Sequence, residues 1–85
     1  MTYQIFFTDK ASKQLKKLEK NDQKRIIKSL ERIRIRPETH VTKLVGDSGY
    51  KLRVGVYRVI LDIEKEKLII LVLLIGQRKN IYDKI

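Results

Sequence analysis

The order of hydrophobic and polar residues predicts a strand, two helices and then a run of strands. Apolar residues alternate with other side chains over positions 3–7, as in a strand with one buried face. The next residues, Thr8 and Asp9, are both suited to cap the first turn of a helix. The sequence therefore predicts a short strand that leads directly into a helix.

Two amphipathic helices are expected between Thr8 and Pro37. Their apolar stripes are Ala11, Leu15 and Leu18 in the first helix, and Ile26, Ile27, Leu30 and Ile33 in the second. Asn21 and Asp22 are expected to break the first helix and to cap the second, which Pro37 then ends. Because so few residues join them, the two helices should form an antiparallel hairpin.

From residue 41 onward the hydrophobic period changes from helical to alternating. Strands are predicted over residues 41–45, 50–54, 57–63 and 67–75, with turns at 46–49 and 64–66. The last strand is apolar at almost every position, which predicts a central strand covered on much of both faces. One or two helical turns are expected over 80–85.

These elements indicate a single α+β domain over residues 1–85. The expected fold is a mostly antiparallel sheet of four or five strands, with the N-terminal helical hairpin packed on one face. The expected element order is β-α-α-β-β-β-β. No linker, repeat or low-complexity segment indicates a second domain.

Residues 50–60 carry the strongest functional signal. If Gly55 and Val56 form a two-residue turn, Arg53 lies directly opposite Arg58. Like charges in that arrangement destabilise a sheet by up to roughly 1 kcal/mol per pair. An anion between them removes this cost, and guanidinium groups bind phosphate well. The pattern therefore indicates a phosphate-binding site on the polar face of this hairpin.

Other residues are expected to converge on the same place. Lys51 shares the polar face with Arg53 and Arg58. Arg78 follows the last strand, whose end should lie beside the start of its antiparallel neighbour. Tyr82 is expected at the rim, as a stacking platform or a proton carrier. Each residue alone is best explained as part of a solvated basic surface, but the group together favours a phosphate site.

The charge balance supports an anionic partner. The 85 residues include 20 Lys and Arg against 10 Asp and Glu, a formal net charge of +10. Such an excess on a small domain implies nucleic acid, an acidic protein or an anionic membrane. The lysines of the first helix are most simply a solvated face, but their number also suits attraction to RNA. The further candidates for contact with RNA phosphates are Lys13, Lys17, Lys43 and Lys79.

Several classes of site are excluded or disfavoured. The chain has no cysteine, which excludes a disulfide framework and a thiolate metal site. His40 is the single histidine, so a catalytic histidine pair is impossible and a surface loop residue is expected. Acidic residues follow no metal-ligand spacing, and no cofactor fingerprint is present, so neither a metal nor a cofactor is expected. No signal peptide or membrane-length apolar run is visible, which favours a cytoplasmic protein without a membrane partner.

The basic hairpin and the segments before and after it resemble a known family. Residues 50–60, preceded by Lys43-Leu44-Val45-Gly46 and followed by 75–82, look like the RelE/ParE toxin superfamily. The resemblance covers essentially the whole chain and implies a RelE-like, microbial-RNase-like fold. Members of the RelE branch are toxins that enter the ribosomal A site and cut messenger RNA. An acidic antitoxin encoded beside them holds them inactive, which implies a heterodimer or heterotetramer.

Carried over position by position, the resemblance implies an active site. Lys51 and Arg53 match two basic strand residues of RelE, and Arg58 matches the basic residue at the start of the next strand. Arg78 matches the arginine after the last strand, and Tyr82 matches a tyrosine that stacks on a base.

The chain also departs from the RelE pattern. Arg53 stands where the best-known member has lysine, and the loop between Arg53 and Arg58 is shorter. Gln77 stands where many relatives have histidine, which argues against the branch that uses a carboxylate–histidine pair.

The mechanism that follows is metal-free transesterification of RNA. The 2′-hydroxyl attacks the adjacent phosphate, arginines stabilise the developing charge, and Lys51 is the candidate base. The ribosome would hold the messenger RNA in the reactive geometry. Two alternatives stay open: a ParE-like protein of the same fold that acts on DNA gyrase without nuclease chemistry, and a non-catalytic RNA-binding module.

Overall fold

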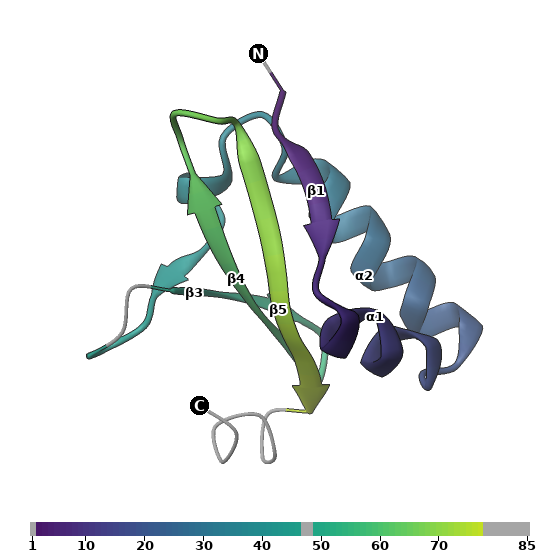
Figure 1. Ribbon diagram of the computed structural model, residues 1–85. Coiled ribbons are helices and arrows are strands. Elements are labelled where there is room, and N and C mark those ends of the chain that lie inside the picture. Colours follow the sequence, from purple (N-terminus) through teal and green to yellow (C-terminus); the bar gives the residue numbers. More distant parts are fainter. Residues whose placement is uncertain (1, 47–48, 78–85) are drawn as a thin grey trace.

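The computed structural model describes residues 2–46 and 49–77, which form two helices packed against a sheet (Figure 1). The elements are β1 (Gln4–Phe7), α1 (Asp9–Lys16), α2 (Lys20–Arg32), the 3-10 turn η1 (Pro37–Thr39), β2 (Thr42–Lys43), β3 (Tyr50–Val54), β4 (Tyr57–Glu64) and β5 (Ile69–Gln77). The order of helices and strands expected from the sequence is confirmed. The expected helical turns over 80–85 lie outside the described residues.

The strands form one mixed sheet in the order β1-β5-β4-β3-β2. β1 runs parallel to β5, and the other neighbouring strands pair antiparallel. The expectation that the last strand is central is wrong, because β4 is in the centre and β5 lies between β4 and β1. β5 is apolar because strands flank it on both sides and helices cover one face. Its other face is only half-buried, at residues such as Leu71 and Leu74.

Thr8 joins β1, α1 and β5. Its hydroxyl caps α1 by accepting a hydrogen bond from the Ala11 amide at 3.1 Å, as the sequence predicted. The same hydroxyl donates to the Leu73 carbonyl at 3.2 Å. Further along β5, the Ile75 amide donates to Gln14 Oε1 of α1 at 2.8 Å. Side chains of α1 and its N-cap therefore hydrogen-bond the backbone of β5 beyond the end of the short strand β1.

The connection between the helices differs from the expectation. α2 already begins at Lys20, with Glu19 as its N-cap residue, so Asn21 and Asp22 lie in its first turn. The Gln23 side chain donates to the Leu18 carbonyl at 2.8 Å. The same side chain donates to the carbonyl of Lys16, the last residue of α1, at 3.4 Å. Gln23 thus bonds both the end of α1 and the connection, and α2 begins two residues earlier than the polar residues suggested.

The end of α2 also differs. The helix ends at Arg32, and Pro37 begins η1 instead. The Tyr3 amide donates to the Arg34 carbonyl at 2.8 Å, and Arg34 Nε donates to the Tyr3 carbonyl at 2.7 Å. These two hydrogen bonds connect the segment after α2 to the start of β1. The helix therefore ends at a tertiary contact, several residues before Pro37 could end it.

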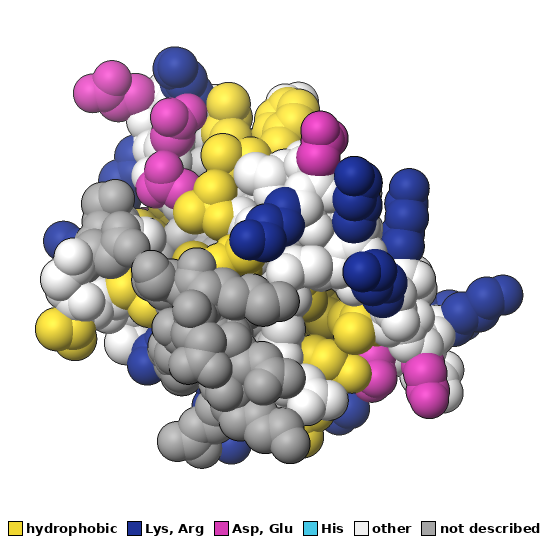
Figure 2. Space-filling view, turned by 60° about the horizontal axis from the view of Figure 1, so that its bottom comes forward, with side chains coloured by type: hydrophobic (Ala, Val, Ile, Leu, Met, Phe, Trp, Pro, Cys, Tyr) yellow, Lys and Arg dark blue, Asp and Glu magenta, His cyan; other side chains and the backbone are white. Residues whose placement is uncertain are grey.

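The outward faces of both helices are rich in lysine. Figure 2 shows Lys and Arg side chains gathered over the side of the molecule on which the helices lie. The exposed lysines of these two helices and their connection are Lys10, Lys13, Lys16, Lys17, Lys20, Lys24 and Lys28. Neither helix is long and apolar enough to cross a membrane.

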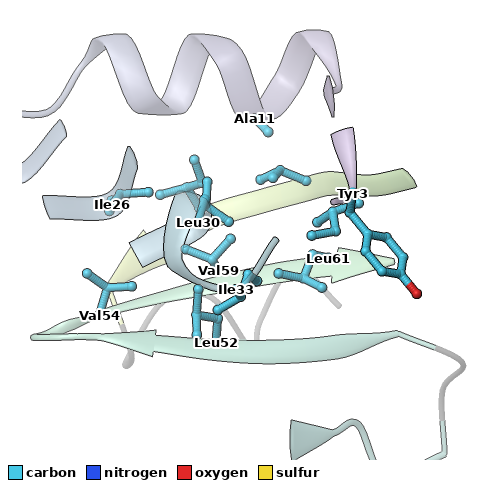
Figure 3. Packing of buried hydrophobic residues seen from close by; sticks show 12 residues of the cluster. Tyr3, Ala11, Ile26, Leu30, Ile33, Leu52, Val54, Val59 and Leu61 are labelled. Carbon is cyan, nitrogen blue, oxygen red and sulfur yellow. The ribbon is translucent and has the colours of Figure 1, made fainter. Parts of the chain in front are cut away.

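The core lies between the helices and one face of the sheet (Figure 3). The fully buried stripe of α2 is Ile26, Leu30 and Ile33, as predicted, whereas Ile27 of that stripe is only half-buried. The helices pack on the residues that face them along the strands: Leu52, Val54, Val59, Leu61, Ile70, Val72 and Ile75. The step from Val72 to Ile75 is three residues because the pairing of β4 with β5 shifts register between Ile60 and Leu61. The remaining alternate residues point to the opposite side, called the outer face from here on.

Candidate phosphate-binding site

The hairpin of β3 and β4 has the register that the sequence predicted. Val54 pairs with Tyr57, and Arg53 pairs with Arg58. Gly55 takes a φ of 58°, the conformation that glycine supplies at the first central position of a type II′ turn. The two-residue turn therefore fixes which side chains face each other across the hairpin.

The two arginines lie opposite each other on the outer face, but their exposure differs. Arg53 is exposed, whereas only 7% of the surface of Arg58 is accessible. The polar pattern of the hairpin predicts that both arginines lie on one exposed face, and this prediction is wrong for Arg58. Arg58 belongs to the central strand, between Arg53 on one side and Gly76 on the other. Its Nη1 donates to the Tyr57 carbonyl at 3.2 Å, so the guanidinium lies back along its own strand.

Lys51 is on the same face. It is two residues before Arg53 in β3, and its partner in β4 is Ile60, which is buried. Lys51 itself is half-buried. The structure thus brings together Lys51, Arg53 and Arg58 on adjacent positions of two strands.

The end of β5 lies beside this group, as predicted. Gly76 pairs with Arg58, and Gln77 pairs with Tyr57. The predicted site residues Arg78, Lys79 and Tyr82 lie outside the described residues.

The other predicted phosphate contacts do not join the group. Lys43 pairs with Tyr50, so it shares the helix side of the sheet and not the outer face. Lys13 and Lys17 belong to the exposed lysine surface of α1 and its C-terminal end. Lys13 and Lys17 therefore belong to a basic surface separate from the arginine pair.

Sequence reasoning missed how the hairpin end is fixed. The Tyr57 hydroxyl donates to Asp22 Oδ2 of α2 at 3.0 Å. This hydrogen bond, with burial and the nearby negative charges of Asp22 and Glu19, raises the pKa of Tyr57 above 10.0, while a hydrogen bond from the Gln77 side chain partly lowers it. No sequence pattern indicates this contact, because the two residues are far apart in the chain and α2 was expected to begin at Asp22.

A second contact of the hairpin end also involves α2. A Cβ added to Gly55 would lie 3.5 Å from Arg25 Nη1, so the guanidinium of Arg25 lies close to the turn. Over residues 2–46 and 49–77, no group of three His, Cys, Asp or Glu side chains could hold a metal ion. The candidate site residues that the structure describes, Lys51, Arg53 and Arg58, are all basic.

Comparison with known proteins decides the family. The family model described as "ParE toxin of type II toxin-antitoxin system, parDE" matches residues 5–82. The chain belongs to this toxin family. It is therefore a toxin of a type II toxin–antitoxin system, within the RelE/ParE superfamily that its sequence resembles. No curated protein matches the chain.

Solved structures of RelE toxins show the same fold. The toxin-antitoxin complex RelBE2 from Mycobacterium tuberculosis matches with a TM-score of 0.85 at 20% identity, covering 94% of this chain and 95% of that chain. A mutant of the E. coli toxin RelE in the free state matches with a TM-score of 0.79 at 28% identity, covering 96% and 90%. The intact E. coli RelBE toxin-antitoxin complex matches with a TM-score of 0.74 at 27% identity, covering 91% and 96%. The toxin thus has a RelE-like fold.

Proposed function

We propose that this toxin is a ribosome-dependent endoribonuclease that cleaves messenger RNA in the A site and so inhibits translation. The observation that carries the proposal is the register that places Arg53 opposite Arg58 on the outer face, with Lys51 beside them. A net charge of +10 gives the attraction that a ribosomal substrate requires.

The proposed chemistry needs no metal. The 2′-oxygen bonds to the adjacent phosphorus, the bond from phosphorus to the 5′-oxygen breaks, and the products end in a 2′,3′-cyclic phosphate and a 5′-hydroxyl. Lys51 takes the 2′ proton as general base, and water gives a proton to the departing 5′-oxygen. Arg53 and Arg58 stabilise the charge that develops on the phosphate oxygens, with Arg78 as a third donor and Tyr82 stacking on a base.

The test is direct. The purified toxin is added to ribosomes that hold a defined messenger RNA, and the ends of the RNA are mapped and characterised. The proposal predicts a cut within the A-site codon, a cyclic phosphate end and a 5′-hydroxyl end, with little cleavage when ribosomes are omitted. A 3′-hydroxyl with a 5′-phosphate, or uncut RNA, would contradict it.

A second candidate function is inhibition of DNA gyrase. It is favoured by the family model, which is that of the ParE toxin. A plasmid supercoiling assay with purified gyrase separates the two functions, because a gyrase inhibitor blocks supercoiling and leaves ribosome-bound messenger RNA intact. Lys51, Arg53 and Arg58 match basic residues of the RelE active site, and this match supports the nuclease as the first choice.

The proposed partner is an acidic antitoxin encoded nearby, forming a heterodimer or heterotetramer in the cytoplasm. Several solved structures of similar fold are toxin-antitoxin complexes. A groove of about 490 Å³ between β1 and α2 offers the apolar anchor, since Ile5, Phe7 and Ile27 line it. Ile27 also lines an adjoining hollow of about 520 Å³ whose rim includes Lys20, Lys24 and Lys28. An apolar floor with a lysine rim suits an acidic, amphipathic chain.

β1 adds backbone groups to this groove. The amides of Gln4 and Thr8 bond to β5, so the backbone groups of Ile5 and Phe7 point away from it, towards the groove. Among the described strands, none pairs with this edge. An extended segment of the antitoxin can therefore bond along β1 while its side chains enter the groove.

Co-purification with the neighbouring gene product across a salt series tests the anchor. Ile27→Asp is expected to release the partner, whereas Ile35→Asp serves as a control because Ile35 is 66% exposed and outside the groove. The wild-type complex should survive high salt. Complete dissociation at moderate salt would show that charge alone holds the partner and that no apolar anchor exists.

A further inference from the structure

The end of the β3–β4 hairpin is tied to α2 from the helix side of the sheet. The Tyr57 hydroxyl donates to Asp22 Oδ2 at 3.0 Å. The guanidinium of Arg25, three residues along α2, lies close to Gly55 in the turn. The first half of α2 therefore holds the hairpin end through one hydrogen bond, and Arg25 lies beside the turn.

The same hairpin end carries the like-charged pair. With a two-residue turn, Val54 and Tyr57 form the hydrogen-bonded pair next to the turn, and Arg53 and Arg58 form the next pair. In such a non-hydrogen-bonded pair the Cα atoms are only about 4.5 Å apart. Repulsion between the two guanidinium groups favours opening of the hairpin at this end.

Tyr57 connects the helix side with the outer face. Its hydroxyl bonds to Asp22, and its backbone carbonyl accepts the hydrogen bond of Arg58 Nη1 at 3.2 Å. Because both bonds involve one residue, the contact with α2 limits the movement of the strand segment against which the Arg58 guanidinium lies.

We propose that Asp22 and Tyr57 are positioning residues, whose hydrogen bond holds Arg53 and Arg58 together against their repulsion before an anion arrives. The proposal rests on the proposed function for its role in RNA cleavage, but the positioning can be measured without RNA. A cation pair that is already in place needs no reorganisation when a phosphate binds. Neither Asp22 nor Tyr57 is itself assigned a contact with substrate.

Native-state hydrogen exchange of the Val54 amide, which pairs with Tyr57, measures opening of the hairpin end. Tyr57→Phe removes the hydroxyl and is expected to speed exchange about five-fold, the effect of one typical hydrogen bond. Asp22→Asn keeps an acceptor oxygen for the Tyr57 hydroxyl. The Val54 amide of this variant should exchange at close to the wild-type rate. Tyr50→Phe is the matched control, since it removes a tyrosine hydroxyl from β3 on the same side of the sheet.

A double-mutant cycle separates positioning from a merely structural role. Arg53→Gln removes the repulsion that the Asp22–Tyr57 bond is proposed to resist. Tyr57→Phe should therefore speed Val54 exchange clearly less in the Arg53→Gln background than in the wild type. An equal effect in both backgrounds, or no effect of Tyr57→Phe at all, would overturn the proposal.

Cleavage on ribosomes gives the functional readout. Under saturating ribosomes, Tyr57→Phe should lower the single-turnover cleavage rate about ten-fold with unchanged ribosome affinity, while Tyr50→Phe and Asp22→Asn cleave at nearly the wild-type rate. A wild-type toxin that does not cleave RNA would refute the proposed function. The double-mutant cycle of Val54 hydrogen exchange would still test whether Asp22 and Tyr57 position the arginine pair. A wild-type toxin that cleaves, with Tyr57→Phe cleaving equally fast, would overturn the role of positioning in catalysis.

Discussion

Arg58 is a charged residue with 7% of its surface accessible, in the central strand of a small sheet. Burial of a cation is costly unless it is hydrogen-bonded and balanced by opposite charge. Among residues 2–46 and 49–77, the Arg58 guanidinium donates to the Tyr57 carbonyl, which carries no charge, and the facing residue is another arginine. This imbalance is the physical reason to expect an anion at the hairpin when the toxin acts.

The same imbalance predicts opposite effects of one substitution on stability and on activity. Arg53→Gln relieves the repulsion of Arg58, so it should stabilise the isolated toxin by up to about 1 kcal/mol. Urea denaturation of both proteins at low salt measures the difference, which should shrink at high salt because ions screen the repulsion. A clear loss of stability in the variant would contradict the account of this pair.

Tyr57 gives a prediction about pH. Its pKa is raised above 10.0 in the folded protein, chiefly by the hydrogen bond to Asp22. The folded protein therefore holds the proton more tightly than the unfolded chain, so this stabilisation is complete below about pH 10 and is lost as the pH rises beyond it. Comparison of wild type with Tyr57→Phe isolates the effect, because the other titrating groups are shared. The stability difference between the two proteins should narrow above pH 10, and a constant difference would be evidence against the bond.

Part of the site could be predicted from residue order alone. The turn at Gly55 and the alternation of β3 and β4 are local, so the pairing of Arg53 with Arg58 followed from them. The burial of Arg58 and the contact of Tyr57 with Asp22 depend on how α2 packs on the sheet. Such tertiary contacts leave no periodic signal in the sequence.

At the scale of elements, Thr8 has a role that the sequence only half indicated. Its capping of α1 was predicted, but its bond to the Leu73 carbonyl of β5 was not. The connection between α1 and α2 was placed too late, because the side chain of Gln23 satisfies a carbonyl at Leu18. Local polarity marks where a helix can begin, and long-range bonds decide where it does.

Substitution of Thr8 tests this junction. Thr8→Val keeps the shape of the side chain but loses both hydrogen bonds, so it should destabilise the toxin by about 1–3 kcal/mol. Thr8→Ser keeps the hydroxyl and should cost much less. Thermal or urea unfolding of the two variants measures the contrast, and equal stability of Val and Ser variants would show that neither bond matters.

At the scale of the whole molecule, the arginine pair and the helical lysines form two separate basic regions. The first lies on the outer face of the sheet. The second lies on the exposed sides of α1 and α2 (Figure 2). A net charge of +10 is therefore divided between a compact site and a broad surface. The broad surface suits recruitment to RNA, and the compact site suits the reaction.

Salt dependence tests this division. Ribosome affinity should fall steeply with salt, and the double variant Lys13→Gln with Lys17→Gln should flatten the logarithmic slope by roughly 1–2. The same variant should leave the cleavage rate on saturated ribosomes unchanged. A lowered rate at saturation, with an unchanged slope, would assign these lysines to the reaction instead of recruitment.

The most direct measurement compares single-turnover cleavage of an A-site codon by the wild type, Arg53→Gln and Arg78→Ala, under saturating ribosomes. Arg32→Gln is the charge-matched control, because Arg32 is exposed at the end of α2. We predict that Arg53→Gln and Arg78→Ala each lower the rate by about 100–1,000-fold, the usual effect of removing one donor to a developing negative charge. Arg32→Gln should cleave like the wild type. Undiminished cleavage by Arg53→Gln and Arg78→Ala, with ribosome binding unchanged, would contradict the assignment of this hairpin as the active site.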